Sequence, residues 1–330
     1  MYTSFDNDSL VKIITLLKSH RAEYLSGQDI SEALKLSLVA VWKHIKKLQR
    51  LGYKIDSKAK LGYRLTKKTE LLFPWELLDG LEPQVFGRRV YYFDVIDSTQ
   101  NYAIRLAKKP EENGSLIVSE KQTHGRGRLD RNWVSPSGGI WMSLVLQPNF
   151  EIPSVTLFPV LASLAVAIAI EKSLKIKPKL KWPNDVTLRG KKVAGILVDA
   201  SIESGKIEHL VLGIGINFKI NPTQIDKIIK GAGNYYGVTT LVRKNDGADP
   251  IKLVQILLYE LENVYQLILN KNYQELIREW TKRSPIIGKK VSISTPTGII
   301  EGKAIQVDYD GALLLSSKGV KQRVLVGDVR

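Results

Sequence analysis

The chain contains no cysteine and only four histidines among its 330 residues. The absence of cysteine excludes disulfide bonds, thiolate metal sites and a cysteine nucleophile, and it fits a reducing compartment such as the cytoplasm. No two histidines have the spacing of a metal-binding motif such as HExxH. We therefore expect a cytoplasmic protein whose chemistry depends on other side chains.

Long hydrophobic runs are also scarce. The N-terminal residues lack the apolar core of a signal peptide. The longest apolar run extends from Leu157 to Ile170 and contains Pro159 and Ser163. This run is too short to span a bilayer, so it predicts a buried helix and no membrane partner.

The composition is that of a globular protein, with 44% hydrophobic and 25% charged residues. The length predicts two or three domains. Residues 1–68 hold 14 Lys and Arg against 6 Asp and Glu, so this segment carries +8 of the total net charge of +16. Such a concentration of positive charge indicates a polyanionic partner such as nucleic acid, although charge alone fits a generally basic, soluble protein equally well.

The basic segment has the pattern of three helices. Ser9 can cap the first helix, Ser26 and Asp29 have capping-box spacing before the second, and Ser37 can cap a third that Gly52 ends. The apolar stripe of the first helix consists of Leu10, Ile13, Ile14 and Leu17. The expected inner stripe of the third helix consists of Leu38, Val41, Ile45 and Leu48.

A hairpin follows, because residues 53–55 and 63–65 alternate apolar and polar side chains around a polar turn. This order of elements, with a turn before a basic helix and a hairpin after it, is the plan of a winged helix-turn-helix. In such a domain the helix that follows the turn enters the major groove of DNA. The alternative is a protein-interaction domain with a solvated basic face, but the tight turn and the wing favour DNA. The residues expected to contact DNA are Ser37, Val39, Ala40, Lys43, His44, Lys46 and Lys47.

Residues 67–83 form a connector, because Lys67, Lys68, Pro74 and Pro83 interrupt any long regular element. From Val90 onward apolar strands alternate with helices, which predicts an α+β core. Strands are expected at 90–93, 115–119, 140–146, 179–182, 193–201 and 209–218, and helices at 99–108, 155–174 and 253–270. Short strands and turns in the last 45 residues predict a small SH3-like β-barrel.

The expected domains are thus 1–66 (winged helix-turn-helix), 67–83 (linker), 84–285 (catalytic, with a mixed sheet) and 286–330 (barrel).

Gly125-Arg126-Gly127-Arg128 has the composition of an anion-binding loop. Glycines let backbone N–H groups approach a ligand, and two guanidinium groups supply fixed positive charge. A tetrapeptide of this kind also occurs in disordered basic tails, but here Trp133, a Gly-Gly pair and an apolar strand follow it. The setting is therefore ordered, and the loop suits a carboxylate that is joined to a phosphate.

Three further stretches carry polar groups at strand ends. In Lys181-Trp182-Pro183-Asn184-Asp185, Asp185 could bind Mg²⁺ directly or through water, although an Asn-Asp turn explains the same residues. The stretch 192–197 places Lys192 at the start of a buried strand, either as a surface residue or reaching an acyl phosphate. The stretch 213–217 alternates glycine and isoleucine before Asn217, which permits a close approach by a ligand or a neighbouring strand.

In their order and spacing these stretches, with Asp97-Ser98-Thr99 and Gln122, resemble the biotin–protein ligase family. Residues 37–45 resemble the recognition helix of its bifunctional members, which also repress biotin-synthesis genes, and the tail resembles the family's C-terminal barrel. The resemblance covers nearly the whole chain. It implies an enzyme that makes biotinyl-5′-AMP from biotin and ATP and then transfers biotin to a carrier lysine.

The resemblance also implies roles for individual residues. Arg126, Arg128 and Lys192 would be catalytic, and Asp185 would be the Mg²⁺ ligand. Biotin would contact Ser98, Thr99, Gln100, Gln122, Gly125, Arg126, Gly127, Arg128, Lys192, Gly195 and Gly213. ATP and the adenylate would contact Arg126, Arg128, Arg131, Trp133, Lys181, Asn184 and Asn217.

Two departures from the family pattern stand out. The loop continues as Leu129-Asp130 where relatives often have arginine and glycine, so we expect it to carry less positive charge, to be less flexible and to close more loosely over the adenylate. Gln100 stands where the family usually has asparagine.

The implied partners are the biotin carboxyl carrier protein of acetyl-CoA carboxylase, operator DNA of biotin-synthesis genes, and a second copy of the chain when biotinyl-AMP is bound. Two alternatives remain. A lipoate–protein ligase would share the fold and chemistry, and a repressor that only senses biotin would have lost catalysis. The intact Arg126, Arg128 and Lys192 disfavour the second alternative.

Overall fold

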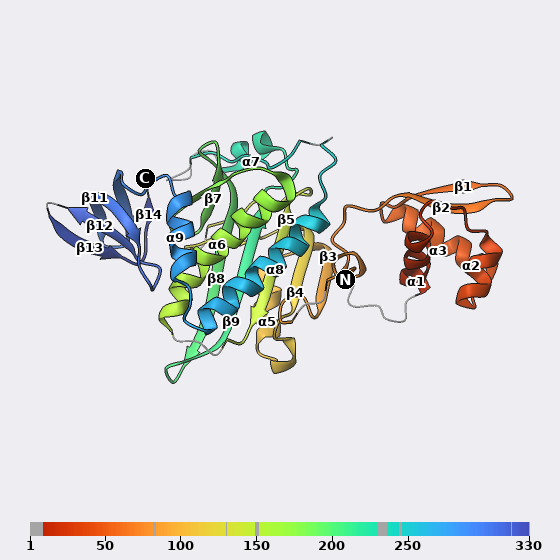
Figure 1. Cartoon of the computed structure of the whole chain (residues 1–330), viewed down its shortest axis with the longest axis horizontal. Helices are drawn as coiled ribbons and strands as arrows, with labels where there is room; N and C mark the ends of the chain where they lie inside the picture. Colours follow the sequence, from red (N-terminus) through yellow and green to blue (C-terminus); the bar gives the residue numbers. More distant parts are fainter. Residues whose placement is uncertain are drawn as a thin grey trace.

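A computed structural model describes residues 9–81, 84–129, 131–148, 152–229, 236–243, 246–317 and 319–329. Three units follow one another along the long axis of the molecule (Figure 1). They are a helical head with a hairpin, a central sheet with its helices, and a C-terminal set of strands. Pro83, Asp130 and Lys318 lie outside the described residues.

The head consists of α1 (Ser9–Ser19), α2 (Gly27–Leu34), α3 (Leu38–Arg50) and the hairpin β1 (Lys54–Lys58) and β2 (Gly62–Lys67). The capping box of Ser26 and Asp29 is present, and Ser37 accepts a hydrogen bond from the Ala40 amide. Ser9 is the first residue of α1. The winged helix-turn-helix plan is therefore confirmed.

The expected position of Leu38 in the inner stripe of α3 is wrong. Its side chain is 51% exposed, whereas Val41, Ile45 and Leu48 are buried. Leu38 begins the helix and lies beside Gly27, the first residue of α2, which has no side chain to cover it. Periodicity alone could not show that the packing partner is missing at this end of the helix.

The connector contains a short helix, α4 (Pro74–Leu77), whose four residues are buried. Phe73 stacks on Trp75 and also packs against Tyr92 of the central sheet. The amide of Gln255 in α8 (Pro250–Leu269) donates to the carbonyl of Leu77. The connector is therefore packed onto the central unit along part of its length.

The central sheet has the strand order β3-β4-β5-β9-β8-β7-β6, and only β3 and β4 run parallel. The strands are β3 (Val90–Ile96), β4 (Leu116–Gln122), β5 (Ile140–Leu146), β6 (Lys179–Lys181), β7 (Asp185–Leu188), β8 (Lys191–Glu203) and β9 (Lys206–Ile216). This mixed sheet with its helices confirms the predicted α+β core. The sequence did not predict β7, whose first residue is Asp185.

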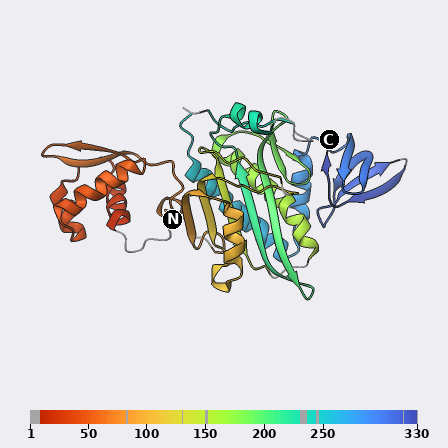
Figure 2. The same cartoon turned by 180° about the vertical axis from the view of Figure 1, so that it is seen from behind.

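Helices cover both faces of this sheet. In Figure 1, α6 (Pro153–Leu174), α8 (Pro250–Leu269) and α9 (Gln274–Arg283) lie in front of the strands. On the other face, α5 (Thr99–Ala107) packs on β4, β5 and β9, as Figure 2 shows from behind. A 3-10 turn (Pro110–Glu112) follows α5, and α7 (Pro222–Ile229) lies near one end of the sheet (Figure 1).

The long apolar run forms α6, as predicted. By length and composition, Ser154–Leu174 could also cross a membrane, but 67% of its most apolar window is buried inside the molecule. It packs against α8, α9 and β8. The apolar character of α6 is thus explained by its position in the core of the central unit.

The C-terminal strands form an antiparallel sheet of order β13-β12-β11-β10-β14. They are β10 (Lys290–Thr295), β11 (Gly298–Val307), β12 (Leu313–Ser317), β13 (Val320–Val324) and β14 (Asp328–Val329). Thr156 in α6 donates to the carbonyl of Asp310, and the indole of Trp182 donates to that of Gly311. These contacts fix the C-terminal sheet against the central unit.

Candidate functional site

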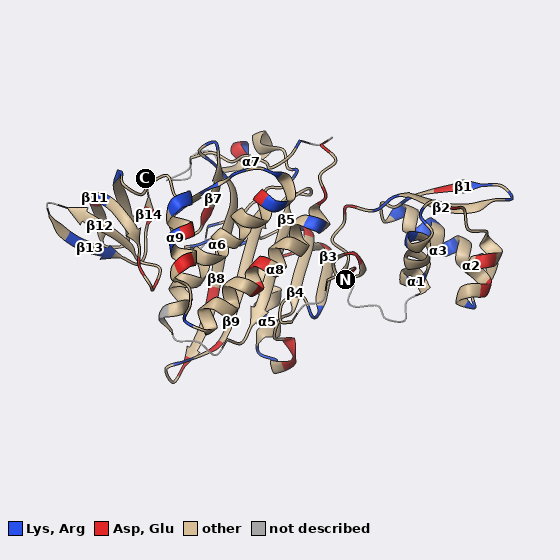
Figure 3. Cartoon of the chain, in the orientation of Figure 1, with Lys and Arg blue, Asp and Glu red and all other residues tan. Residues whose placement is uncertain are grey.

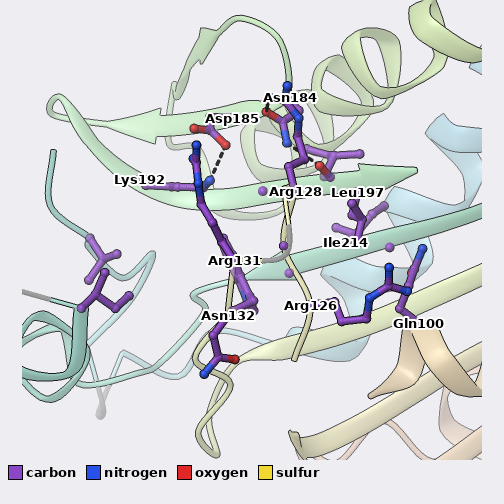
Figure 4. A pocket seen from close by; sticks show the side chains of 18 of the residues that line it. Gln100, Arg126, Arg128, Arg131, Asn132, Asn184, Asp185, Lys192, Leu197 and Ile214 are labelled. Carbon is purple, nitrogen blue, oxygen red and sulfur yellow. Dashed lines mark hydrogen bonds and ion pairs between the residues drawn. The ribbon is translucent and has the colours of Figure 1, made fainter. Parts of the chain in front are cut away.

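A pocket opens beside β8 and β9 and collects side chains from segments far apart in the sequence (Figure 4). Of the residues expected to bind biotin or nucleotide, all except Gly125 and Asn217 line it. Residues that sequence reasoning did not single out also line it, including Asn132, Met142, Ser143, Leu197, Ile214, Tyr236 and Asp328. Tertiary structure therefore brings the predicted motifs together at one site.

The glycine-rich loop is held by its own backbone. The amide of Gly127 donates to the Arg131 carbonyl, and that of Trp133 donates to the Gly125 carbonyl. A Cβ on Gly125 would lie 2.6 Å from the Ser135 hydroxyl oxygen, so no larger residue fits there. Gly125 thus shapes the loop without lining the pocket.

The departure at Leu129 has a structural consequence. Leu129 adopts a left-handed backbone with φ of 53°, and its side chain is 61% exposed. This conformation is uncommon for a branched residue and favours glycine or asparagine. The second half of the loop therefore presents an apolar side chain where the family's arginine would present charge.

Arg126 points toward β8, where its guanidinium pairs with Asp199 at 3.1 Å. The same carboxylate accepts a hydrogen bond of 2.9 Å from the Gln100 amide. The Gln100 oxygen in turn accepts from Ser143. Asp199 had no motif to mark it, yet it joins an expected catalytic residue to an expected biotin contact.

Arg128 contacts two elements at once. Its Nη1 donates to Asn184 Oδ1 at 3.1 Å and lies 3.4 Å from Asp328 Oδ1 in β14. Arg131 also pairs with Asp328. Burial lowers the pKa of Arg128, and the carboxylates of Asp328 and Asp185 oppose that shift. The C-terminal sheet therefore contributes a carboxylate to this pocket.

Lys192 at the start of β8 pairs with Asp185 Oδ1 at 2.5 Å (Figure 4). The other oxygen of Asp185 accepts a hydrogen bond of 2.6 Å from Tyr236. Burial, with Asp185 as the next cause, raises the pKa of Tyr236, so this phenol stays protonated. Lys181 lies 3.6 Å from the centre of the Tyr236 ring, and burial lowers the pKa of Lys181.

Trp133 lies over two paired glycines. Gly195 in β8 and Gly215 in β9 face each other across the ladder, and a Cβ on them would lie 2.9 Å and 2.5 Å from atoms of the indole. The alternation of small and apolar residues in β9 thus makes room for this ring. Its Nε1 packs against Gly215 and is buried without a hydrogen-bond partner, so the ring is held against the sheet by packing.

The other expected biotin contacts lie at the start of α5. Ser98 caps this helix, and the amide and hydroxyl of Thr99 both donate to the Gln122 oxygen, at 2.8 and 3.1 Å. The Gln122 nitrogen donates to Ser135. These side chains are therefore held in fixed orientations at one wall of the pocket.

Asn184 and Asn217 are buried, and their side chains form hydrogen bonds with backbone carbonyls. Asn184 donates to the Ile196 carbonyl, while Asn217 donates to the Lys192 carbonyl at 3.4 Å. Asn217 therefore lies behind Lys192 and not on the pocket wall.

Among the residues that the structure describes, no group of three or more His, Cys, Asp or Glu side chains is placed to hold a metal ion. Asp185 already contacts Lys192 and Tyr236. The pocket is instead lined by the cationic side chains of Arg126, Arg128, Arg131, Lys181 and Lys192, which suits anionic substrates.

The residues expected to contact DNA lie on α3 or just before it. Ser37, Val39, Lys43, Lys46 and Lys47 are exposed, and Ala40 and His44 are half-buried. Figure 3 shows lysine and arginine along α3 and on the hairpin. This part of the head presents an exposed basic surface.

A mixed sheet with a cationic pocket, joined to a helix-turn-helix head and a C-terminal sheet, defines a class of ligases that handle anionic substrates. Three family models match these units. The biotin/lipoate A/B protein ligase family model matches residues 92–217, an HTH domain matches 10–64, and the biotin protein ligase C-terminal domain matches 286–330.

Named relatives agree with these matches. The chain is 35% identical to the bifunctional ligase/repressor BirA of Bacillus subtilis over 314 residues, which is 94% of this chain and 95% of the relative. It is 29% identical to the protein of the same name from Escherichia coli, over 98% of this chain and 97% of the relative. The chain therefore belongs to the biotin protein ligase family.

A solved structure supports the same fold. The biotin protein ligase of Aquifex aeolicus, in complex with biotin and ATP, matches with a TM-score of 0.61 at 28% identity. The match covers 73% of this chain and 97% of that one.

Proposed function

We propose that the protein is an ATP-dependent biotin–protein ligase. It forms biotinyl-5′-AMP from biotin and ATP and transfers biotin to a lysine on the biotin carboxyl carrier protein of acetyl-CoA carboxylase. Through its helix-turn-helix head it also acts as a biotin-responsive repressor. It works in the cytoplasm.

The observation that carries the enzymatic proposal is the pairing of the pocket's cations. Arg126 pairs with Asp199, Arg128 and Arg131 pair with Asp328, and Lys192 pairs with Asp185. These side chains keep their orientation through internal carboxylates. Negative charge that enters the pocket therefore meets cations already aimed at it, which is the arrangement that electrostatic catalysis needs.

In the first step an oxygen of the biotin carboxylate attacks the α-phosphorus of ATP. The bond from that phosphorus to the bridging oxygen breaks, and pyrophosphate leaves. Arg126, Arg128 and Lys192 reduce the repulsion between the carboxylate and the phosphate and stabilise the charge that develops. Trp133 provides an aromatic surface for the adenine.

In the second step the neutral amine of the carrier lysine attacks the carbonyl carbon of the mixed anhydride. The carbon–oxygen bond to phosphate breaks, AMP leaves, and the amine loses a proton as the amide forms. No protein nucleophile is required, in accord with a chain that lacks cysteine. Closure of residues 125–131 over the adenylate would keep water from the anhydride.

For substrate contacts we propose that the biotin ring binds at the wall formed by Ser98, Thr99 and Gln122. Gln100 lies next to this wall and is held by hydrogen bonds to Ser143 and Asp199. The proposed biotin and nucleotide contacts are those predicted from the sequence that line the pocket, which leaves out Gly125 and Asn217.

We also propose Mg²⁺ as the companion of ATP. Magnesium sites often combine one or two carboxylates with substrate phosphates and water, and Asp185 is the carboxylate proposed here. Because both of its oxygens are engaged by the protein, most ligands would come from the nucleotide and water. The metal would offset phosphate charge.

For regulation we propose that biotinyl-AMP favours a homodimer, which presents two heads to a two-fold operator near biotin-synthesis genes. The HTH match and the basic face of α3 support this part of the proposal.

The enzymatic proposal is tested by incubating the purified chain with ATP, Mg²⁺ and either biotin or lipoate, and measuring pyrophosphate release. A carrier domain is then added and its mass measured. Biotin-dependent release followed by a biotin-sized mass gain is expected. Lipoate-dependent turnover, or biotin binding without pyrophosphate release, would replace the proposal by one of its two alternatives.

A further inference from the structure

One large apolar side chain on the recognition helix α3 is not explained by packing. Trp42 is 51% exposed, although tryptophan is highly buried on average. It lines a surface hollow together with Lys43, Lys46, Gln49 and Arg50. The core side of the same helix is formed by Val41, Ile45 and Leu48. Trp42 therefore lies outside the apolar core of the head.

The spacing of these residues defines a face. Trp42, Lys46, Gln49 and Arg50 stand at i, i+4, i+7 and i+8, which places them along one side of the helix. Gln49 donates to the carbonyl of Ile55 in β1, so this side of α3 lies next to the wing. A surface between a recognition helix and its wing is positioned to meet nucleic acid.

The exposed apolar residues of α3 gather in its N-terminal half, where Leu38, Val39 and Trp42 are 51%, 62% and 51% exposed. Exposed basic residues begin with Lys43 beside Trp42 and continue through the C-terminal half as Lys46, Lys47 and Arg50. In helix-turn-helix proteins the N-terminal residues of this helix reach base edges. Lysine and arginine further along are suited to phosphates.

We propose that Trp42 is a specificity-determining residue that packs against the C5-methyl group of thymine in the major groove of duplex DNA. Among the groups that base pairs present there, this methyl is the apolar one. The four basic and polar neighbours in the hollow complement the phosphate backbone. The inference rests on the proposed DNA-binding function of the head and assigns a base to it.

The first experiment establishes the DNA sequence. Full-length protein, with biotin, ATP and Mg²⁺, selects duplexes from a random-sequence library, and the selected sites are aligned. Trp42→Ala is selected in parallel. We expect a thymine preference in the wild-type sites that the variant loses. No enrichment by the wild type would reject the repressor function itself, and with it this inference.

The second experiment isolates the methyl group. Each conserved thymine of the selected duplex is replaced by deoxyuridine, which keeps every hydrogen-bonding group and lacks only the methyl. At the contacted position wild-type affinity should fall about fourfold, as expected for one buried methyl-sized group. Trp42→Ala should bind the thymine and uridine duplexes equally.

Matched controls separate base reading from general loss of binding. Lys46→Ala should weaken binding to all duplexes by the same factor. It should also reduce the slope of log affinity against log salt concentration by about one, as expected for the loss of one phosphate contact. Lys12→Ala removes an exposed charge from α1. It should change neither the affinity for the duplexes nor the salt dependence of binding. Because Trp42 is exposed, its alanine variant should keep the wild-type melting temperature and biotinylation rate.

Two outcomes would overturn the inference while the repressor function stands. One is wild-type binding that is indifferent to uridine at every position. The other is a Trp42→Ala variant that loses affinity equally for all sequences, which would make Trp42 a backbone or partner contact.

Discussion

Arg128 and Asp328 are neighbours in space, with 3.4 Å between their charged atoms, although 200 positions separate them in the sequence. Asp328 opens β14, the last strand described, and also pairs with Arg131. The C-terminal sheet thus fixes two arginines of the glycine-rich loop.

Asp328→Ala should lower kcat/KM for ATP about tenfold, because one charge-assisted contact of this kind is worth about 1.5–3 kcal/mol. Affinity for biotin measured without ATP should change much less. Asp308→Ala is the matched control, since Asp308 pairs with Arg323 in the same domain. Equal effects of the two variants would argue against a role for Asp328 at the pocket.

Arg126→Ala and Lys192→Ala should each lower biotin-dependent pyrophosphate release by about 10²–10³, because one stabilising group at a developing charge is commonly worth about 2.7–4 kcal/mol. Lys191→Ala, at the exposed neighbour of Lys192, provides the control. Near-normal pyrophosphate release from both pocket variants would refute the site assignment.

Tyr236→Phe should lower kcat several-fold with little change in KM for biotin. The lost hydroxyl leaves Asp185 held by Lys192 alone, so the lysine is less well oriented. Steady-state kinetics with varied biotin would separate the two constants. Tyr259→Phe, on exposed α8 surface, should match the wild type. A change in KM alone would show that Tyr236 contacts biotin instead.

Gly215→Ala should displace Trp133, because the new Cβ would meet the indole. We expect a loss of about 1–3 kcal/mol in unfolding free energy and weaker ATP binding. Denaturant unfolding and calorimetric titration measure the two effects. Gly27→Ala has ordinary contacts of 3.6 Å and should be tolerated. An unchanged ATP affinity in Gly215→Ala would place the adenine elsewhere.

Glu120 should make the free energy of unfolding depend on pH. Burial, with Asp94 as a second cause, raises the pKa of Glu120 to about 7 from its ordinary 4.5. Because the folded state favours the protonated carboxyl, its stability should fall as pH rises from 4.5 to 7, by at most about 3 kcal/mol. Glu120→Gln should reduce this fall in denaturant unfolding measured at pH 5 and pH 8. An identical pH profile in both proteins would contradict the shift.

Local patterns in the sequence were sufficient for most elements. The strand 140–146 agrees with β5 residue for residue, and the capping residues Ser26 and Ser37 begin the helices they were expected to begin. These features depend on neighbours in the chain, such as side-chain alternation or a hydroxyl three residues before an amide. Leu38 shows the limit of prediction from local patterns. It is exposed because its neighbour in α2 is a glycine, and the pattern of α3 alone does not reveal that neighbour.

By itself the sequence determined the class of protein, because the glycine-rich loop, the polar strand ends and the basic head lie in contiguous motifs. Tertiary structure alone decided which carboxylate faces each cation. Asp199, Asp328 and Tyr236 belong to no motif, and they reach the pocket because strand pairing and domain docking bring distant segments together. Charge pairing acts through space, so the order of residues along the chain cannot reveal it.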